Sequence, residues 1–183
     1  MWWALALVIV LLVWVITGLA SRLDRLHGRI AAAHTALDAQ LVRRAWAAIE
    51  LTRLGVLDPA ATLVITESAT LALDSDDIYD GERQLIESEL SRALRAGLDE
   101  CEYSSIANNE LGLVTLHALA SAFVRSEMTR RFHNDAVVSA VRIRRKTIVR
   151  LFRLAGRAPM PTTVELDDEL PPGLRDYDVR VGL

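Results

Sequence analysis

Apolar positions along this chain follow two different patterns. From Met1 to Ser21 no side chain is charged, and nearly every residue from Trp2 to Leu19 is apolar. As a helix, about 20 residues rising about 1.5 Å each cross a hydrocarbon layer of about 30 Å. Further along, apolar residues recur every three or four positions, which is the period of an amphipathic helix. We therefore expect residues 1–21 to form a transmembrane anchor and the remainder to be mainly helical.

The apolar run from Trp2 to Leu19 has the features of a retained anchor. Trp2 and Trp3 at its start suit the aromatic belt of a membrane interface, and Trp14 is the third tryptophan of the anchor. A cleaved secretory signal is the alternative, because residues 18–20 resemble a cleavage site. No Lys or Arg precedes the run, however, and it is longer than a typical signal core. We expect the helix to stay attached.

Charges on the two flanks of the anchor predict its orientation. The N-terminal flank carries only the α-amine, whereas Arg22, Arg25 and Arg29 follow the anchor closely. Positively charged flanks stay in the cytoplasm, which places the N-terminus outside and the body of the protein inside. The same arginines can bind anionic headgroups of the inner leaflet, each contributing about 1 kcal/mol. Since Lys146 is the only lysine among 21 basic residues, a bias typical of G+C-rich bacteria, we predict a single-pass protein of a bacterial cell membrane.

Periodic apolar positions after the anchor predict an all-α fold, with strand-like alternation only at 177–181. Asp58 followed by Pro59 is a helix start signal, and Gly55 and Gly156 are stop signals. Four helices are therefore expected, over residues 22–54, 59–73, 82–103 and 109–155.

These helices predict the domain organisation and the core. Three parts are expected: an anchor (1–21), an antiparallel helical bundle (22–157) and an extended, acidic, proline-containing tail (158–183). The apolar stripes of the helices are expected to pack against one another. Trp46, Leu85 and Phe132 lie on these stripes and are predicted to belong to the core.

Charge changes sign from segment to segment, although the formal net charge is only −3. Residues 22–57 carry a net +3, 58–106 a net −9, 107–157 a net +7 and 158–183 a net −4. Adjacent antiparallel helices of opposite charge attract each other, so intramolecular complementarity is the simplest interpretation.

Basic residues at the end of the last predicted helix support a more specific hypothesis about what the protein binds. Five of them gather there: Arg142, Arg145, Lys146, Arg150 and Arg153. All but Arg145 lie on one helix face. In an antiparallel bundle this helix returns toward the membrane, so its basic end would bind anionic headgroups or an acidic partner surface. Nucleic acid is disfavoured as a ligand, because no aromatic stacking platform or known motif accompanies these residues.

Residues capable of chemistry form no recognisable active site, and no nucleotide-binding, metalloprotease or hydrolase motif occurs. Cys101 stands among carboxylates that disfavour a thiolate nucleophile. His27 and His34 could share a helix face but have no carboxylate beside them, so a metal site is not expected. The acidic loop 74–81 resembles a calcium loop, but Ile78 stands at a ligand position. We expect no catalytic residue, cofactor or metal, and hence a non-enzymatic protein.

The chain resembles LemA-like proteins in three segments. The sequence from Arg130 to Val137 resembles the family signature R-(R)-x-Y-N-x-A-V, with Phe132 as its aromatic residue and His133 where the family has Tyr. Residues 149–156 and 37–46 resemble further segments of the family. The resemblance implies an N-terminal membrane helix followed by an antiparallel helical bundle. Family members are often drawn with the bundle outside, whereas the arginines after this anchor favour the cytoplasm.

The layout also resembles the accessory subunits of actinobacterial cytochrome oxidase supercomplexes, which are small single-pass proteins with helical bodies. We therefore predict an accessory or scaffold subunit that docks on a larger integral membrane complex, for example a respiratory-chain complex. Its basic helix end and its acidic tail would contact the partner. The alternative is a free-standing LemA-like envelope protein that forms homo-oligomers or binds anionic lipid.

Overall fold

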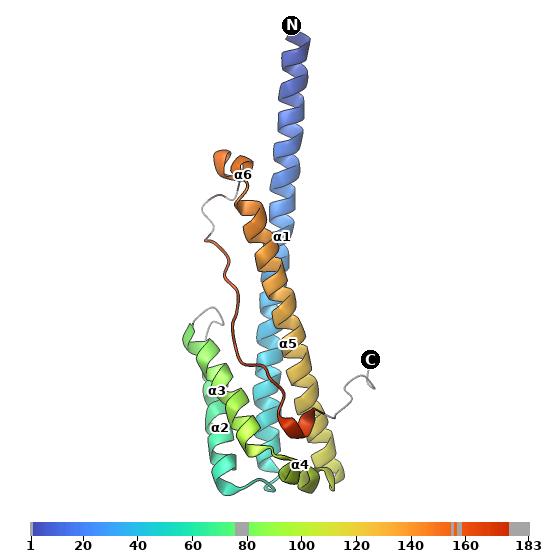
Figure 1. Ribbon diagram of the computed structural model, residues 1–183, viewed down its shortest axis with the longest axis vertical. Coiled ribbons are helices and arrows are strands. Elements are labelled where there is room, and N and C mark those ends of the chain that lie inside the picture. Colours follow the sequence, from blue (N-terminus) through green and yellow to red (C-terminus); the bar gives the residue numbers. More distant parts are fainter. Residues whose placement is uncertain (1, 76–80, 155, 157–158, 176–183) are drawn as a thin grey trace. The chain divides into compact units, whose positions relative to one another are not determined.

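The computed structural model describes residues 2–75, 81–154, 156 and 159–175 (Figure 1). Its elements are α1 (Trp2–Arg53), α2 (Pro59–Asp74), α3 (Gly81–Gly97), α4 (Glu100–Ala107), α5 (Glu110–Arg144), α6 (Thr147–Leu151) and the short 3₁₀ helix η1 (Pro172–Leu174). No strand occurs within these ranges, so the predicted all-α fold is confirmed. The strand-like residues 177–181 and residues 76–80 of the acidic loop lie outside the described part of the chain.

The chain divides into two compact units that carry opposite charge. One comprises Met1–His34 and Phe132–Thr163, and the other comprises Thr35–Arg131 and Val164–Leu183. The first contains 10 basic and 2 acidic residues, a net charge of +8, and we call it the basic unit. The second contains 11 basic and 22 acidic residues, a net charge of −11, and we call it the acidic unit.

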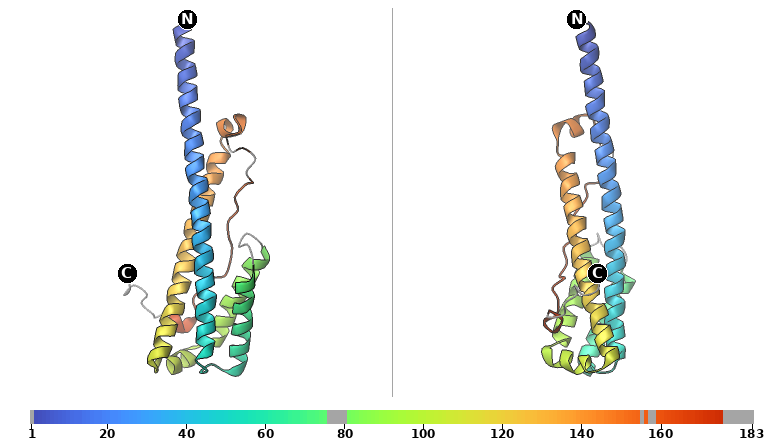
Figure 2. Two further views of the ribbon diagram at one scale, coloured as in Figure 1. Left: turned by 180° about the vertical axis from the view of Figure 1, so that it is seen from behind. Right: turned by 90° about the vertical axis from the view of Figure 1, so that its right-hand side faces the viewer.

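Four helices build most of the core of the acidic unit. Apolar side chains of α1, α2, α3 and α5 are buried together, with further contributions from α4 and η1. Its large, fully buried members include Leu51, Ile65, Leu90, Leu94, Leu116 and Phe123. Helices α2 and α3 form a hairpin whose members lie side by side in both figures (Figures 1 and 2). Because each of these helices is amphipathic, burying the apolar faces together removes them from water.

The start of α2 follows the signal in the sequence. The backbone N–H groups of Ala60 and Ala61 donate to Asp58 Oδ2 at 2.9 and 3.3 Å. Pro59 occupies the first helical position, where its missing N–H costs nothing. The predicted cap at this position is therefore confirmed.

The predicted helix over 82–103 is wrong, because the chain breaks after Gly97 into α3 and α4. A Cβ atom added at Gly97 would lie 2.9 Å from Cδ1 of Ile65, so α2 and α3 approach each other closely there. Asp99 then starts α4 by accepting a hydrogen bond from the backbone N–H of Glu102 at 2.8 Å. The close helix contact and the new cap together redirect the chain.

The basic unit has a smaller core, shared by the first part of α1, the last part of α5, and α6. Its buried members are Leu23, Leu26, Ile30, Val137, Ala140, Ile143 and Val149. N-terminal to this core, α1 is long and apolar enough to cross a membrane, and its side chains from Trp2 to Trp14 are exposed. The three tryptophans of this stretch are 85%, 89% and 72% exposed, in the order Trp2, Trp3 and Trp14.

The predicted continuous helix to residue 155 is also wrong. α5 ends at Arg144, and Lys146 adopts an extended backbone (φ −63°, ψ 136°) before α6 begins. A straight continuation would carry Val149 away from the stripe of Val137 and Ala140, because 3.6 residues complete a turn. The break instead buries Val149 in the core of the basic unit. The basic stripe predicted on one helix face is therefore divided between two elements.

Three residues predicted in the core are exposed. Trp46 is 50% exposed, and Leu85 and Phe132 are each 64% exposed. For Trp46 the reason is the register of α1 in the acidic unit, where the fully buried positions are Leu37, Leu41, Arg44, Ala48 and Leu51. Their spacing of four and three residues is a heptad seam, and Trp46 lies off that seam.

Candidate functional site

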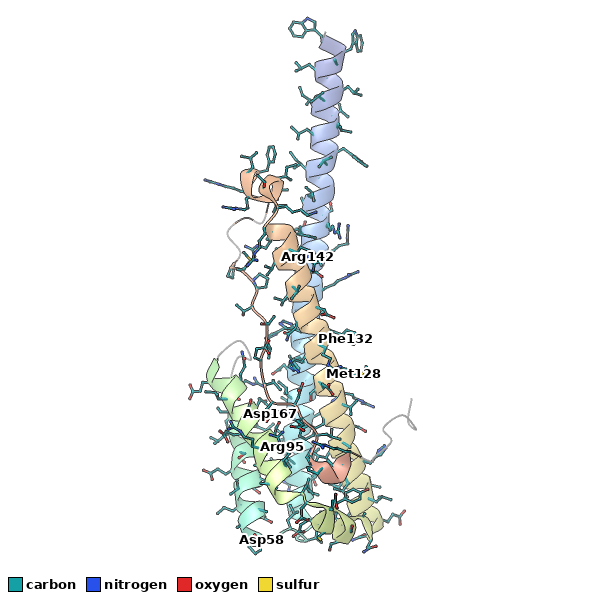
Figure 3. All side chains as sticks on the ribbon, viewed as in Figure 1. Asp58, Arg95, Met128, Phe132, Arg142 and Asp167 are labelled. Carbon is teal, nitrogen blue, oxygen red and sulfur yellow. The ribbon has the colours of Figure 1, made fainter. Side chains whose placement is uncertain are left out.

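Four arginines surround a hollow on the basic unit. Arg22, Arg25 and Arg29 come from α1, and Arg142 comes from α5. The hollow has a volume of about 480 Å³, and its other lining residues are Leu26, Ser139 and Ile143. Figure 3 shows Arg142 near the end of α5.

The packing of the two helices explains why these arginines meet. Leu26 on α1 and Ile143 on α5 are buried in one cluster, which holds the helices together. The positions beside them on each helix then face the solvent, and Arg22, Arg25 and Arg29 recur there at spacings of three and four residues. The structure thus brings together the three arginines after the predicted anchor and one from the predicted basic helix end.

In the part of the chain that the structure describes, no carboxylate is paired with this cluster. Within residues 2–75, 81–154, 156 and 159–175, none of the four arginines forms an ion pair. Asp24 and Asp135 are the only acidic residues in the sequence of the basic unit. Four guanidinium groups around one hollow repel one another, and an anion bound among them would relieve that repulsion. Guanidinium groups also match the geometry of phosphate oxygens, which they bind through two parallel hydrogen bonds.

A second basic hollow lies where α5 passes into α6. It has a volume of about 410 Å³ and is lined by Arg144, Arg145, Val149, Arg150, Arg153, Gly156 and Met160. Arg144 donates a hydrogen bond to the carbonyl oxygen of Pro159, whereas Arg145, Arg150 and Arg153 are exposed. Lys146 is exposed between the two helices and does not line this hollow.

Sequence reasoning missed a buried charged cluster in the acidic unit. Arg44 is fully buried, and its Nη2 lies 2.6 Å from Oε2 of Glu87. Its Nη1 donates to Ser91 Oγ at 3.0 Å, and its guanidinium carbon lies 5.0 Å from the ring centroid of Phe123. The signal was present in the sequence, since Arg44 occupies a heptad position among apolar residues.

Part of the predicted tail is ordered on the acidic unit. Arg95 binds both carboxylate oxygens of Asp167 (Figure 3), and Arg130 binds both oxygens of Asp168 at 2.6 and 3.1 Å. The hydrogen bond from Arg95 is the main cause that lowers the pKa of Asp167. The same contact raises the pKa of Arg95. Asp167 and Asp168 belong to the acidic tail that was predicted to contact a partner. Their carboxylates are instead bound by arginines of the same chain.

Histidines of the basic unit form a pair that the sequence did not indicate. His133 is fully buried, and its ring centroid lies 6.3 Å from that of His34. Burial lowers the pKa of His133, and the neighbouring His34 contributes in the same direction against an opposing backbone contact at Thr162. In the described ranges no three His, Cys, Asp or Glu side chains are close enough to hold a metal ion.

The chain matches no family model, no curated protein and no solved structure. Its resemblance to LemA-like proteins and to respiratory accessory subunits therefore stays a prediction from sequence.

Proposed function

We propose that this chain is a non-enzymatic, single-pass membrane scaffold whose basic unit is held on anionic lipid headgroups. The observation that carries the proposal is the hollow of Arg22, Arg25, Arg29 and Arg142, which begins directly after an uncharged apolar stretch of helix α1. If α1 crosses the bilayer, its first charged side chain marks the headgroup level, so phosphate groups of lipids surround this hollow.

Lipid phosphates are the anions that this position favours. Each basic residue near an anionic membrane surface contributes about 1 kcal/mol, so four acting together would hold the basic unit firmly against the membrane. The cluster faces a leaflet rich in anionic lipid if the N-terminus is outside, as the charged flank of the anchor predicts. The proposal therefore places the protein in a bacterial cell membrane with the acidic unit in the cytoplasm.

A second candidate function is docking on an integral membrane complex, and the acidic unit favours it. That unit carries a net charge of −11, which its own arginines leave uncompensated. A charge of this size attracts a basic protein surface and speeds association with it. A scaffold held on lipid by the arginines around the hollow would thus present the acidic unit to a partner, such as a respiratory-chain complex, and the exposed Arg145 and Arg150 of the basic unit would add a second contact with that partner.

The lipid proposal is tested by counting lipids bound to the full-length protein. The protein is purified in mild detergent, equilibrated with phosphatidylglycerol or phosphatidylcholine, and examined by native mass spectrometry. We expect the wild type to retain phosphatidylglycerol preferentially, because this lipid carries a net negative charge whereas phosphatidylcholine is zwitterionic. Arg22→Gln, Arg25→Gln, Arg29→Gln and Arg142→Gln together should lose most of that preference, because the four guanidinium groups that attract the anionic headgroup are removed.

The matched control changes the same number of charges on the acidic unit. It combines Arg43→Gln, Arg53→Gln, Arg92→Gln and Arg131→Gln, all at exposed positions. This control is expected to retain the lipid preference. Equal retention of phosphatidylglycerol by the two quadruple variants would overturn the proposal.

A further inference from the structure

Helix α6 and the residue after it carry both buried and exposed apolar side chains. Val149 is fully buried in the core of the basic unit, and Ile148 packs against that core. Leu151 and Phe152, in contrast, are 72% and 41% exposed. The exposed pair is not part of the buried cluster of the basic unit, and leaving its apolar surface in water is unfavourable.

The position of α6 along α1 indicates what covers this pair. Val149 shares a cluster with Leu23, and Leu19 packs against the same cluster. Val15, Ile16, Leu19 and Ala20 of α1 are half-buried, although they precede the first charge at Arg22. Figures 1 and 2 show α6 beside α1, farther toward the N-terminus of α1 than the end of α5. The helix α6 therefore lies beside the last turns of the uncharged stretch.

Charged residues on both sides of the pair fit the boundary between hydrocarbon and headgroups. Arg150 and Arg153 flank Leu151 and Phe152, and both arginines are exposed. Arg153 adopts a positive φ of 48°, which ends the helical turn directly after Phe152. Long basic side chains extend toward the headgroups while the apolar residues beside them insert more deeply.

We propose that α6 and Phe152 form a second membrane contact, in which Leu151 and Phe152 insert among the acyl chains of the leaflet that the arginines face. The occupant of this apolar surface is lipid, because α6 lies beside the uncharged stretch of α1 and the surface is flanked by exposed arginines, which bind phosphate. The inference rests on the proposed function, since it requires α1 to cross the membrane.

The test measures the membrane depth of single labelled cysteines in the full chain. Cys101, which is free and exposed, is replaced by alanine, and one cysteine is introduced by Leu151→Cys and labelled with an environment-sensitive fluorophore. The protein is reconstituted into vesicles of phosphatidylcholine and phosphatidylglycerol that contain spin-labelled quencher lipids. We expect strong quenching at position 151 by lipids labelled near the headgroup.

Two further positions make the outcome decisive. Leu63→Cys in the acidic unit is the matched control, because Leu63 is 69% exposed, and we expect no quenching by lipid there. Val8→Cys reports whether α1 crosses the membrane, and we expect quenching by deeply labelled lipids. Quenching at 8 without quenching at 151 overturns this inference and leaves the proposed function in place, whereas no quenching at either overturns both. A label at 151 that is shielded from lipid quenchers and from aqueous iodide alike would indicate a protein partner, which also overturns the inference.

Discussion

At the scale of single residues, the buried charges of the acidic unit show how polar groups position helices. Glu87 on α3 faces two guanidinium groups, with Arg44 Nη2 at 2.6 Å and Arg83 Nε at 3.8 Å. Arg83 in turn binds Asp38 on α1 at 2.8 Å. A buried ion pair contributes little to stability when compared with an apolar replacement, but losing one partner leaves a costly unpaired charge. The cluster therefore favours one register of α1 against α3.

The same cluster predicts an asymmetry between two substitutions. Glu87→Gln leaves the buried Arg44 without a counterion and should lower the free energy of unfolding by about 3–5 kcal/mol. Arg44→Met should cost less, because Glu87 keeps Arg83 as a partner and the methionine can pack on Phe123. Thermal unfolding of the full-length protein in detergent, followed by circular dichroism, measures both. The double variant should lose less than the sum of the two, and strict additivity would contradict the idea of a coupled pair.

At the scale of elements, residues 164–174 act as a strap across the acidic unit. The backbone N–H of Glu165 donates to Gln84 Oε1 at 2.9 Å, and that of Asp167 donates to Ser88 Oγ at 3.0 Å. Ser91 Oγ donates to the carbonyl of Asp167 at 2.6 Å while it accepts from Arg44. The strap is thus hydrogen-bonded along α3 and is linked to the buried charges beneath it.

Docking of the strap should depend on pH in one direction. The pKa of Asp167 is lowered in the folded protein, so its pairing with Arg95 adds stability above the ordinary aspartate pKa of about 3.9 and loses it as the pH falls through the lowered value. Hydrogen exchange of the strap amides, corrected for the intrinsic rate, should therefore be unchanged from pH 7 to 5 and should accelerate below pH 4. Asp167→Asn should weaken protection several-fold at neutral pH, because a half-exposed ion pair contributes up to about 1 kcal/mol.

Glu165→Gln is the control for the strap, since it removes an exposed carboxylate from the same segment. Its exchange rates should follow those of the wild type across the whole pH range. If Asp167→Asn behaved in the same way, the ion pair would have no function in docking the strap.

The elements also show what the sequence can and cannot predict. The cap at Asp58, the apolar stripe through Leu23 and Leu26, and the all-α class follow from local patterns, and the structure has all three. The breaks after Gly97 and Arg144 were missed, because each depends on a neighbouring helix: Ile65 approaches Gly97, and Val149 turns into a core built by other elements. In the candidate site, the sequence indicated the basic residues but not that Arg142 meets those of α1 around one hollow.

At the scale of the whole molecule, charge is divided between the units more sharply than along the sequence. Helices α1 and α5 each contribute residues to both units. Adding up the charge of each whole helix therefore mixes residues of the basic unit with residues of the acidic unit. The simplest sequence interpretation was attraction between adjacent helices. The structure has such ion pairs between α1 and α3, and it also divides the charge into a unit with a net +8 and another with −11. Such a division is expected when one part of a protein faces anionic lipid and the other faces the cytoplasm.

This division leads to a prediction about the protein in cells. With the N-terminus outside, protease added to intact spheroplasts should leave a C-terminal tag uncut, whereas lysis should expose it.

Purification through the same tag in mild detergent should recover a large membrane complex, and haem absorbance in it would identify a respiratory partner. Exchanging two exposed charges, Arg145→Glu with Arg150→Glu, should reduce this recovery at least several-fold, because the basic end of α5 and α6 would then repel an acidic partner surface.

The control for that exchange is Arg53→Glu with Arg92→Glu, which alters the same number of exposed charges on the acidic unit. Both variants should keep the helical content and unfolding temperature of the wild type, so a loss of recovery confined to the first would assign the contact to the basic unit. Equal recovery of a complex by both variants would exclude that contact while leaving the lipid site intact. Recovery of the wild type alone or as a homo-oligomer would exclude the accessory-subunit function and leave a free-standing membrane scaffold, because the arginines around the hollow need only lipid to neutralise them.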